Sequence, residues 1–304
     1  WIEREKPFKS VAEELETLSR QGDDFRRIIE PQKGDAIFGL ATFLESFDIR
    51  TAYPLLLFLL NAKLGDEQWD EISTLLESYL LRRAVLGWST KAYNRIFLNL
   101  AKSLRAVGAR PEIVKAFLSS LSGESSAWPT DEQFFGAWQG RDTYHDLNNA
   151  KLVHVLSRLN DTYLTNRNER VQIDSPLTVE HILPQTWLKN WPLAGGESGL
   201  SFKELFDASA DDPRAVATRR RDAALQTMGN LTILTQELNS DASNAAWAVK
   251  KSKLLTASLL PINQQLHVYD KWAEDTIAQR SKELFQKATT VWPAPLTQPA
   301  PTNG

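Results

Sequence analysis

Two short segments rich in β-branched residues interrupt a chain whose apolar pattern is otherwise helical. The first spans 177–183 and is followed at once by Pro184, and the second spans 229–235 and opens with a glycine. β-branched residues favour strands, and proline cannot continue a central strand, so each segment predicts a short strand next to a turn. A polar loop at 239–244 and a lysine-bearing helix at 245–255 follow. This order limits the sheet to very few strands.

The first half of the chain carries apolar residues at steps of three and four, from Phe8 to about Leu121. This spacing is typical of amphipathic helices. We predict a mainly α fold with a helical domain over 1–165 and a second domain over 166–292. The tail at 293–304 is rich in proline and is predicted to be disordered.

Composition bounds the class of protein. The 304 residues are 42% hydrophobic and 24% charged, which is typical of a soluble globular chain of about two domains. There is no cysteine, which excludes disulfides, zinc–cysteine sites and thiol nucleophiles. No apolar run is long enough to span a bilayer and no secretion signal is visible, so we expect a cytoplasmic protein without a membrane span.

Basic residues gather in two clusters although the net charge is −3. Any contact with nucleic acid must therefore come from local patches. The densest clusters are Arg219-Arg220-Arg221 and the group Lys250, Lys251 and Lys253. A run of charges is equally compatible with a solvated helix face, so the clusters alone do not decide.

His181 is the strongest candidate for an acid–base residue among the four histidines. It ends the first predicted strand, directly after Glu180, and histidine exchanges protons near neutral pH. His145, His154 and His267 lie in or before helices, and the sequence shows no acidic or amide cluster at a useful spacing near them. A histidine at a strand end is, taken alone, more often structural than catalytic.

A family resemblance decides between these interpretations. The segment Glu180-His181-Ile182-Leu183-Pro184-Gln185, followed by Gly229-Asn230-Leu231-Thr232 and then Asn239 and Asn244, resembles the HNH nuclease motif. It is similar to the HNH domain that ends GmrSD-type modification-dependent restriction enzymes and the related SspE proteins of phosphorothioate-based phage defence. The similarity extends to the segments 76–83, 93–97, 128–134 and 277–280. The resemblance implies a small ββα-metal core in the C-terminal domain.

The resemblance also implies a role for each motif position. His181 would be the general base that activates water, and Asn230 would support the loop that carries it. Asn239 lies where a metal ligand is expected, with Asn244 as the rival, and Glu180 would be the second ligand. Oxygen ligands of this kind suit one Mg²⁺ or Mn²⁺ ion per site.

The resemblance places Lys250 on the helix behind the metal loop, where a lysine can contact a substrate phosphate. We therefore predict a catalytic or DNA-binding role for Lys250. DNA binding is predicted to involve all six basic residues of the two clusters: Lys250, Lys251, Lys253, Arg219, Arg220 and Arg221.

The predicted function is a metal-dependent endonuclease that nicks double-stranded DNA in bacterial defence against phage or modified DNA. The chain begins with Trp1 and holds no Gly-rich loop followed by Lys-Ser or Lys-Thr, so we expect the nucleotide-binding and modification-sensing domain to lie upstream. Two alternatives stay open. One is a non-catalytic nucleic-acid-binding module with a degenerate HNH fold, and the other is an RNA-directed toxin nuclease.

Overall fold

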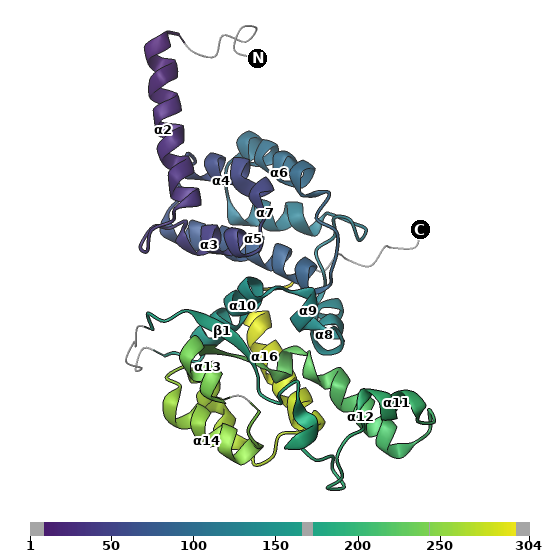
Figure 1. Cartoon of the computed structure of the whole chain (residues 1–304). Helices are drawn as coiled ribbons and strands as arrows, with labels where there is room; N and C mark the ends of the chain where they lie inside the picture. The colour runs from purple at the N-terminus through teal and green to yellow at the C-terminus, as the bar shows by residue number, and fades with distance from the viewer. Residues whose placement is uncertain (1–8, 166–172, 243, 296–304) are drawn as a thin grey trace, which may run out of the picture. The chain divides into compact units, whose positions relative to one another are not determined.

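The computed structural model describes residues 9–165, 173–242 and 244–295, and most of these are helical (Figure 1). The prediction of a mainly α protein is thus confirmed. The chain divides into two compact units. Unit 1 holds residues up to 129 without 84–87, together with the chain from Trp292 onward, and unit 2 holds 84–87 and 130–291. No helix among the described residues has the length and apolarity that crossing a membrane requires.

Among the described residues of unit 1, every regular element is a helix, and turns and loops connect the helices. Its helices have clear start signals: Ser10 caps the first by accepting a hydrogen bond from the backbone N–H of Glu13, and two others carry proline in their first turn. Gly108, at φ 94°, ends the helix Tyr93–Val107. The elements are α2 (Val11–Ile29), α3 (Phe38–Ser46), η1 (Arg50–Ala52), α4 (Tyr53–Leu60), α5 (Asp66–Val85), α6 (Tyr93–Val107) and α7 (Pro111–Ser119).

Unit 2 contains the strands together with the helices that surround them. The elements are α8 (Asp131–Gly140), α9 (Thr143–Asp146), α10 (Asn149–Asp161), β1 (Leu177–His181), η2 (Trp187–Lys189), α11 (Phe202–Asp207), α12 (Pro213–Leu225), η3 (Met228–Asn230), β2 (Leu231–Thr235), α13 (Gln236–Ala242), α14 (Trp247–Ala257), α15 (Pro261–Gln264), η4 (Gln265–Val268) and α16 (Glu274–Val291). The predicted division between 165 and 166 falls inside this unit, so α8 to α10 group with the strands. Of the predicted tail at 293–304, residues 296–304 lie outside the described part of the chain.

The two predicted strands pair with each other as β1 and β2. They are antiparallel, with Leu177 opposite Thr235 and His181 opposite Leu231. The pairing leaves His181 at the last position of β1, where the chain turns away after one more backbone hydrogen bond, from Ile182 N–H to the Asn230 carbonyl oxygen (2.9 Å). The sheet packs against α10 and α13 (Figure 1).

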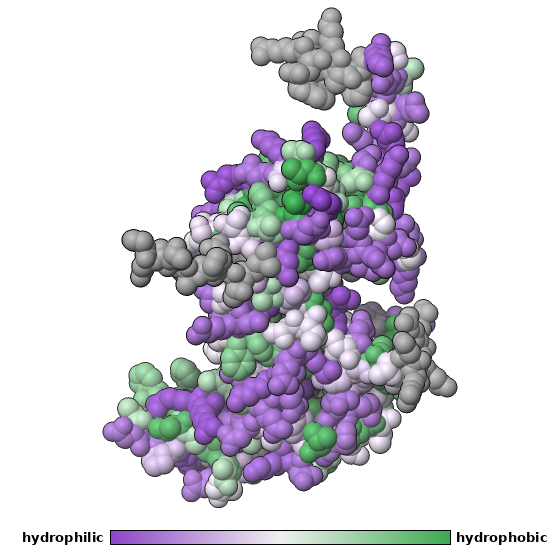
Figure 2. Space-filling view, turned by 180° about the vertical axis from the view of Figure 1, so that it is seen from behind, coloured by the Kyte–Doolittle hydropathy of each residue, from purple (hydrophilic) through white to green (hydrophobic). Residues whose placement is uncertain are grey.

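A buried apolar cluster holds the segments around the sheet together. It includes Ile182, Leu183 and Trp187 after β1, Leu234 on β2 and Ile277 on α16, all at most 2% exposed. Hydrophilic residues cover much of the face seen in Figure 2. The turn that follows His181 thus packs on buried apolar side chains.

Gly229 lets the chain that enters β2 approach α16 closely. A Cβ atom at this position would lie 2.2 Å from the Ile277 carbonyl oxygen, so no larger residue fits without a backbone shift. Arg280 of α16 fixes the same strand entry, because its guanidinium donates to the carbonyl oxygens of Gly229 and Leu231, each at 2.8 Å.

Candidate active site

His181 is held by an amide side chain from the end of α12. The ring is 8% exposed, and its Nε2 lies 2.8 Å from Oε1 of Gln226. An amide oxygen only accepts hydrogen bonds, so Nε2 carries the hydrogen and Nδ1 keeps the lone pair of the neutral ring. Gln226 therefore selects the tautomer in which Nδ1 is the basic atom.

Tyr144 packs on the same imidazole. The two ring centroids are 4.4 Å apart in an edge-on arrangement at 63°, and the backbone N–H of Tyr144 donates to the carbonyl oxygen of Gln226 (3.1 Å). Tyr144 belongs to the short helix α9. Segments from α9, β1 and the end of α12 thus meet around His181 and fix the orientation of its ring.

Burial lowers the pKa of His181 below its ordinary value. The hydrogen bond to Gln226 acts in the opposite direction, because it favours the protonated form, and the nearby Lys250 ammonium adds to the lowering. The shift keeps the ring neutral at neutral pH. A neutral imidazole with its Nδ1 lone pair can accept a proton from water.

Asn230 anchors the turn that follows His181. Its side chain is fully buried, and its Oδ1 accepts from the backbone N–H of Leu183 (2.8 Å) and from Nε1 of Trp272 (3.0 Å). Its Nδ2 donates to the carbonyl oxygens of Leu183 and Leu225, each at 2.9 Å. The amide is therefore engaged on both sides, and its contacts are those of a residue that shapes the loop.

Glu180 and Lys250 form a buried ion pair beside the histidine. The Lys250 side chain is 0% exposed, and its ammonium donates to the Glu180 carboxylate and to the backbone carbonyl oxygen of His181 (2.6 Å). Burial raises the pKa of Glu180 and lowers that of Lys250, while the attraction between the two charges opposes both shifts. Lys250 thus lies inside the fold, where it stabilises the end of β1.

The two candidate asparagine ligands lie in different surroundings. Asn239, on α13, donates through Nδ2 to Thr178 Oγ1 (2.9 Å) and to the Val179 carbonyl oxygen (3.4 Å). Thr178 and Glu180 are two residues apart on β1, so Asn239 lies over the face of the strand from which Glu180 projects. Asn244 is exposed, and its backbone carbonyl oxygen accepts from Nδ2 of Asn190 (2.8 Å).

The predicted donor set for a metal ion consists of oxygen atoms. Among the residues that the structure describes, no three His, Cys, Asp or Glu side chains are grouped to hold a metal. Glu180 offers a carboxylate and Asn239 an amide oxygen, a sparse set of hard ligands of the kind that a hydrated Mg²⁺ or Mn²⁺ ion accepts. An ion there would compete with the Lys250 ammonium for the Glu180 carboxylate.

The arginine run on α12 divides into buried and exposed members. The Arg221 guanidinium is 2% exposed, lies 2.7 Å from the Glu274 carboxylate and 4.9 Å from the ring centroid of Trp187, and also binds backbone carbonyl oxygens. Arg219 and Arg220 are exposed, and Arg220 pairs with Asp275 (2.6 Å). Arg219 and Arg220 are thus accessible to a phosphate, whereas Arg221 is committed to the fold.

The lysines of α14 divide in the same way. Lys251 uses its ammonium to donate to the carbonyl oxygens of His267 (2.9 Å) and Tyr269 (2.8 Å). Lys253 is half-buried and Lys250 is fully buried. The three lysines therefore do not lie together on one exposed basic face of α14.

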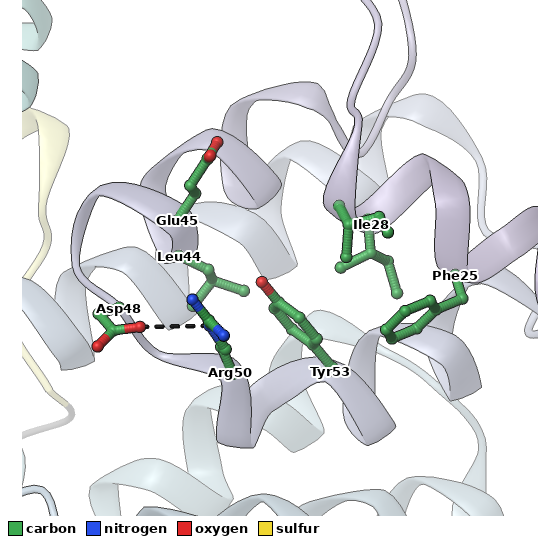
Figure 3. A pocket seen from close by; sticks show the side chains of 8 residues that line it. Phe25, Ile28, Leu44, Glu45, Asp48, Arg50 and Tyr53 are labelled. Carbon is green, nitrogen blue, oxygen red and sulfur yellow. Dashed lines mark ion pairs between the residues drawn. The ribbon is translucent and has the colours of Figure 1, made fainter.

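Every residue predicted for the site lies in unit 2. Unit 1 has a pocket of its own, of about 400 Å³, between α2, α3 and α4. Figure 3 shows Phe25 and Tyr53 on one side of it and the ion pair of Asp48 and Arg50 (3.3 Å) on the other. None of the predicted site residues lines this pocket.

Sequence reasoning missed Gln226 and Tyr144. Gln226 is 45 positions from His181, and a lone glutamine at a helix end carries no recognisable signal. Tyr144 lies beside His145. Sequence reasoning found no acidic cluster near this histidine, yet the Asp142 carboxylate lies 2.8 Å from its ring. The backbone hydrogen bond from Tyr144 to Gln226 (3.1 Å) joins α9 to the end of α12, and the two residues reach His181 together.

The fold and the site define a mainly helical protein with a two-stranded sheet whose first strand ends in a buried, hydrogen-bonded histidine. The family model for the C-terminal domain of GmrSD restriction endonucleases matches residues 128–287, which is more than half of the chain. The chain belongs to this family, as the motif predicted. Membership indicates a nuclease role of the restriction endonuclease type. A search of the curated proteins finds no match to the chain.

Proposed function

We propose that the chain is a metal-dependent HNH endonuclease that nicks double-stranded DNA during modification-dependent restriction in the bacterial cytoplasm. One observation carries this proposal: a neutral histidine at a strand end, whose tautomer is fixed by Gln226 so that Nδ1 can act as a base. The antiparallel β1 and β2 are followed by the helices α13 and α14, an order that supports a ββα core. The family match supports a nuclease over a bare binding module.

In the proposed reaction, Nδ1 of His181 takes a proton from a water molecule that attacks the scissile phosphate. Tyr144 and Gln226 hold the ring in place, and Asn230 fixes the turn behind it. A positioned general base contributes about 10²-fold to 10⁴-fold to such a step. A Mg²⁺ or Mn²⁺ ion, bound by Glu180 and by Asn239 or Asn244, would neutralise charge that develops on the phosphate.

DNA contact is proposed to be local and blind to sequence. Arg219 and Arg220 present exposed guanidinium groups on α12, and the chain as a whole carries a net charge of −3. Attraction over long distances is therefore weak, and affinity must come from a few phosphate contacts that release counterions. One active site meets one strand at a time, so a nick is the expected product.

The test is a plasmid-relaxation assay on supercoiled DNA with Mg²⁺ or Mn²⁺, and with EDTA. Wild type should convert supercoiled to open circular DNA only with the metal, and His181→Ala should lower the rate by about 10²-fold or more. His267→Ala is the matched control, because that ring binds the Gln264 carbonyl oxygen through Nδ1 (2.8 Å) and takes no part in the site.

Two results would refute the mechanism: full activity of the His181→Ala variant, or wild-type activity in EDTA equal to that with the metal ion. A parallel arm with structured RNA in place of the plasmid checks the substrate, since cleavage of RNA alone would replace DNA by RNA in the proposal.

A further inference from the structure

A second histidine flanks the same tyrosine that packs on His181. The ring centroid of His145 lies 5.3 Å from that of Tyr144, and the His181 centroid lies 4.4 Å from it. The two imidazoles are therefore separated by no more than these two distances combined.

Asp142 binds the His145 imidazole tightly and in one orientation. Its carboxylate oxygens lie 2.8 Å and 2.9 Å from Nδ1 of His145, and it also accepts from the backbone N–H of His145 (3.1 Å) as the cap of α9. A carboxylate only accepts hydrogen bonds, so Nδ1 is the donor. The exchangeable position of this ring is thus Nε2, on a side chain that is 63% exposed.

The neighbouring charges leave this pair undisturbed. Arg141 and Asp146, which flank it in sequence, are bound to each other (2.7 Å). Arg141 further donates to the carbonyl oxygen of Leu86 (2.9 Å). Asp142 is therefore the acidic group that holds the His145 ring.

The other described histidines do not share these features. His154 is half-buried, and burial lowers its pKa to about 4. His267 is bound through Nδ1 to a backbone carbonyl oxygen rather than to a carboxylate. An exposed imidazole that a carboxylate orients, beside a second imidazole at a strand end, is the arrangement that paired proton transfer needs.

We propose that His145, oriented by Asp142, is a second acid–base residue of the site and protonates the leaving 3′-oxygen of the scissile phosphodiester. The inference rests on the proposed nuclease function and deepens it. As the water oxygen bonds to phosphorus, its proton passes to Nδ1 of His181. The bond from phosphorus to the 3′-oxygen breaks, and its electron pair takes the proton from Nε2 of His145. The products are a 5′-phosphate and a 3′-hydroxyl, and the two histidines exchange protons with water to restart.

The test replaces the leaving atom and leaves the rest of the substrate unchanged. One duplex carries a single 3′-bridging sulfur at a chosen phosphodiester, and the matched duplex carries oxygen there. A thiol is far more acidic than an alcohol, with a pKa of about 8.5 for the cysteine side chain, so the thiolate leaves without a proton. Cleavage at this position is measured for wild type, His145→Gln and His181→Gln.

The cleavage rate of the His145→Gln variant should fall by about 10²-fold to 10⁴-fold on the oxygen duplex and stay close to the wild-type rate on the sulfur duplex. The His181→Gln variant should cleave both duplexes more slowly, because both reactions need the base. Asp142→Asn should repeat the pattern of His145→Gln more weakly, and thermal unfolding of each variant shows whether the fold is intact.

Three results would overturn the inference. The first is cleavage of the oxygen duplex by the His145→Gln variant at the wild-type rate. The second is an equal loss of cleavage rate on both duplexes, since equal loss marks a contact that only binds or shapes the site. In either case wild-type cleavage still supports the nuclease proposal. Absence of cleavage of both duplexes by wild type would instead refute the nuclease function itself, and this inference with it.

Discussion

The ammonium group of Lys250 donates a hydrogen bond to the carboxylate of Glu180 at a place where the lysine is 0% and the glutamate side chain 13% exposed. Removing one member of such a pair leaves a buried charge without its partner. We expect Lys250→Met to destabilise unit 2 by about 3–5 kcal/mol. The measurement is the free energy of unfolding from urea titration.

The double variant Glu180→Gln, Lys250→Met separates the lost attraction from lost packing. It removes both charges and should recover a large part of the stability, because a neutral pair of similar volume costs little. A Lys250→Met chain that is as stable as wild type yet binds DNA with a flatter salt dependence would instead favour the phosphate contact that the sequence suggested.

The hydrogen bond between Gln226 and His181 should matter for rate more than for stability. Gln226→Ala frees the imidazole to adopt either tautomer, and loss of a supporting partner of this kind costs about 10-fold to 100-fold. The plasmid-relaxation rate is the measurement. Gln226→Glu, which still accepts the hydrogen bond from Nε2, should retain more activity than Gln226→Ala, and the reverse order would show that the bond does not position the base.

Patterns of residue type predicted the strands, and they could not predict how the charges are arranged around them. The β-branched segments at 177–183 and 229–235 form β1 and β2 because short-range preference and burial agree there. Arg221 belongs to a basic run whose sequence is compatible with a solvated helix face. In the structure, its guanidinium packs on the Trp187 ring and forms an ion pair with Glu274, 53 positions away. The sequence cannot show such a partner, because the contact arises only when α12 meets the start of α16.

The stability of unit 2 should fall at acidic pH because of His154 on α10. Burial, aided by Arg158, lowers its pKa to about 4 in the folded chain, whereas the unfolded chain keeps a value near 6.5. Between these values the unfolded chain binds more protons, so stability decreases as the pH falls from 6.5 to about 4 and does not depend on this group outside that window. The loss is at most about 3 kcal/mol.

The pH dependence is checked by measuring the free energy of unfolding at pH 7 and pH 4.5 for wild type and for the His154→Gln variant. Other groups titrate in the same interval, so the relevant quantity is the difference between the two proteins. The variant should lose less stability than wild type over this pH change. Equal losses would show that His154 is protonated in the folded chain without cost.

The salt dependence of DNA binding should identify which basic residues reach the phosphates. Arg219 and Arg220 are exposed on α12, whereas the ammonium group of Lys251 donates hydrogen bonds to the carbonyl oxygens of His267 and Tyr269. Each phosphate contact contributes about 0.9 to the slope of log affinity against log salt concentration. The double variant Arg219→Ala, Arg220→Ala should therefore flatten the slope by nearly two units on two unrelated duplexes alike.

Lys251→Ala is the matched control for this measurement, since it removes the same kind of charge from a side chain that already has two acceptors. Its slope should equal that of wild type, while its unfolding midpoint should fall because two carbonyl oxygens lose their donor. A flatter slope for Lys251→Ala together with an unchanged slope for the arginine variant would move the DNA-binding surface from α12 to α14. Unequal effects of the arginine variant on the two duplexes would mean that these arginines contact base edges, which carry sequence information, as well as phosphates.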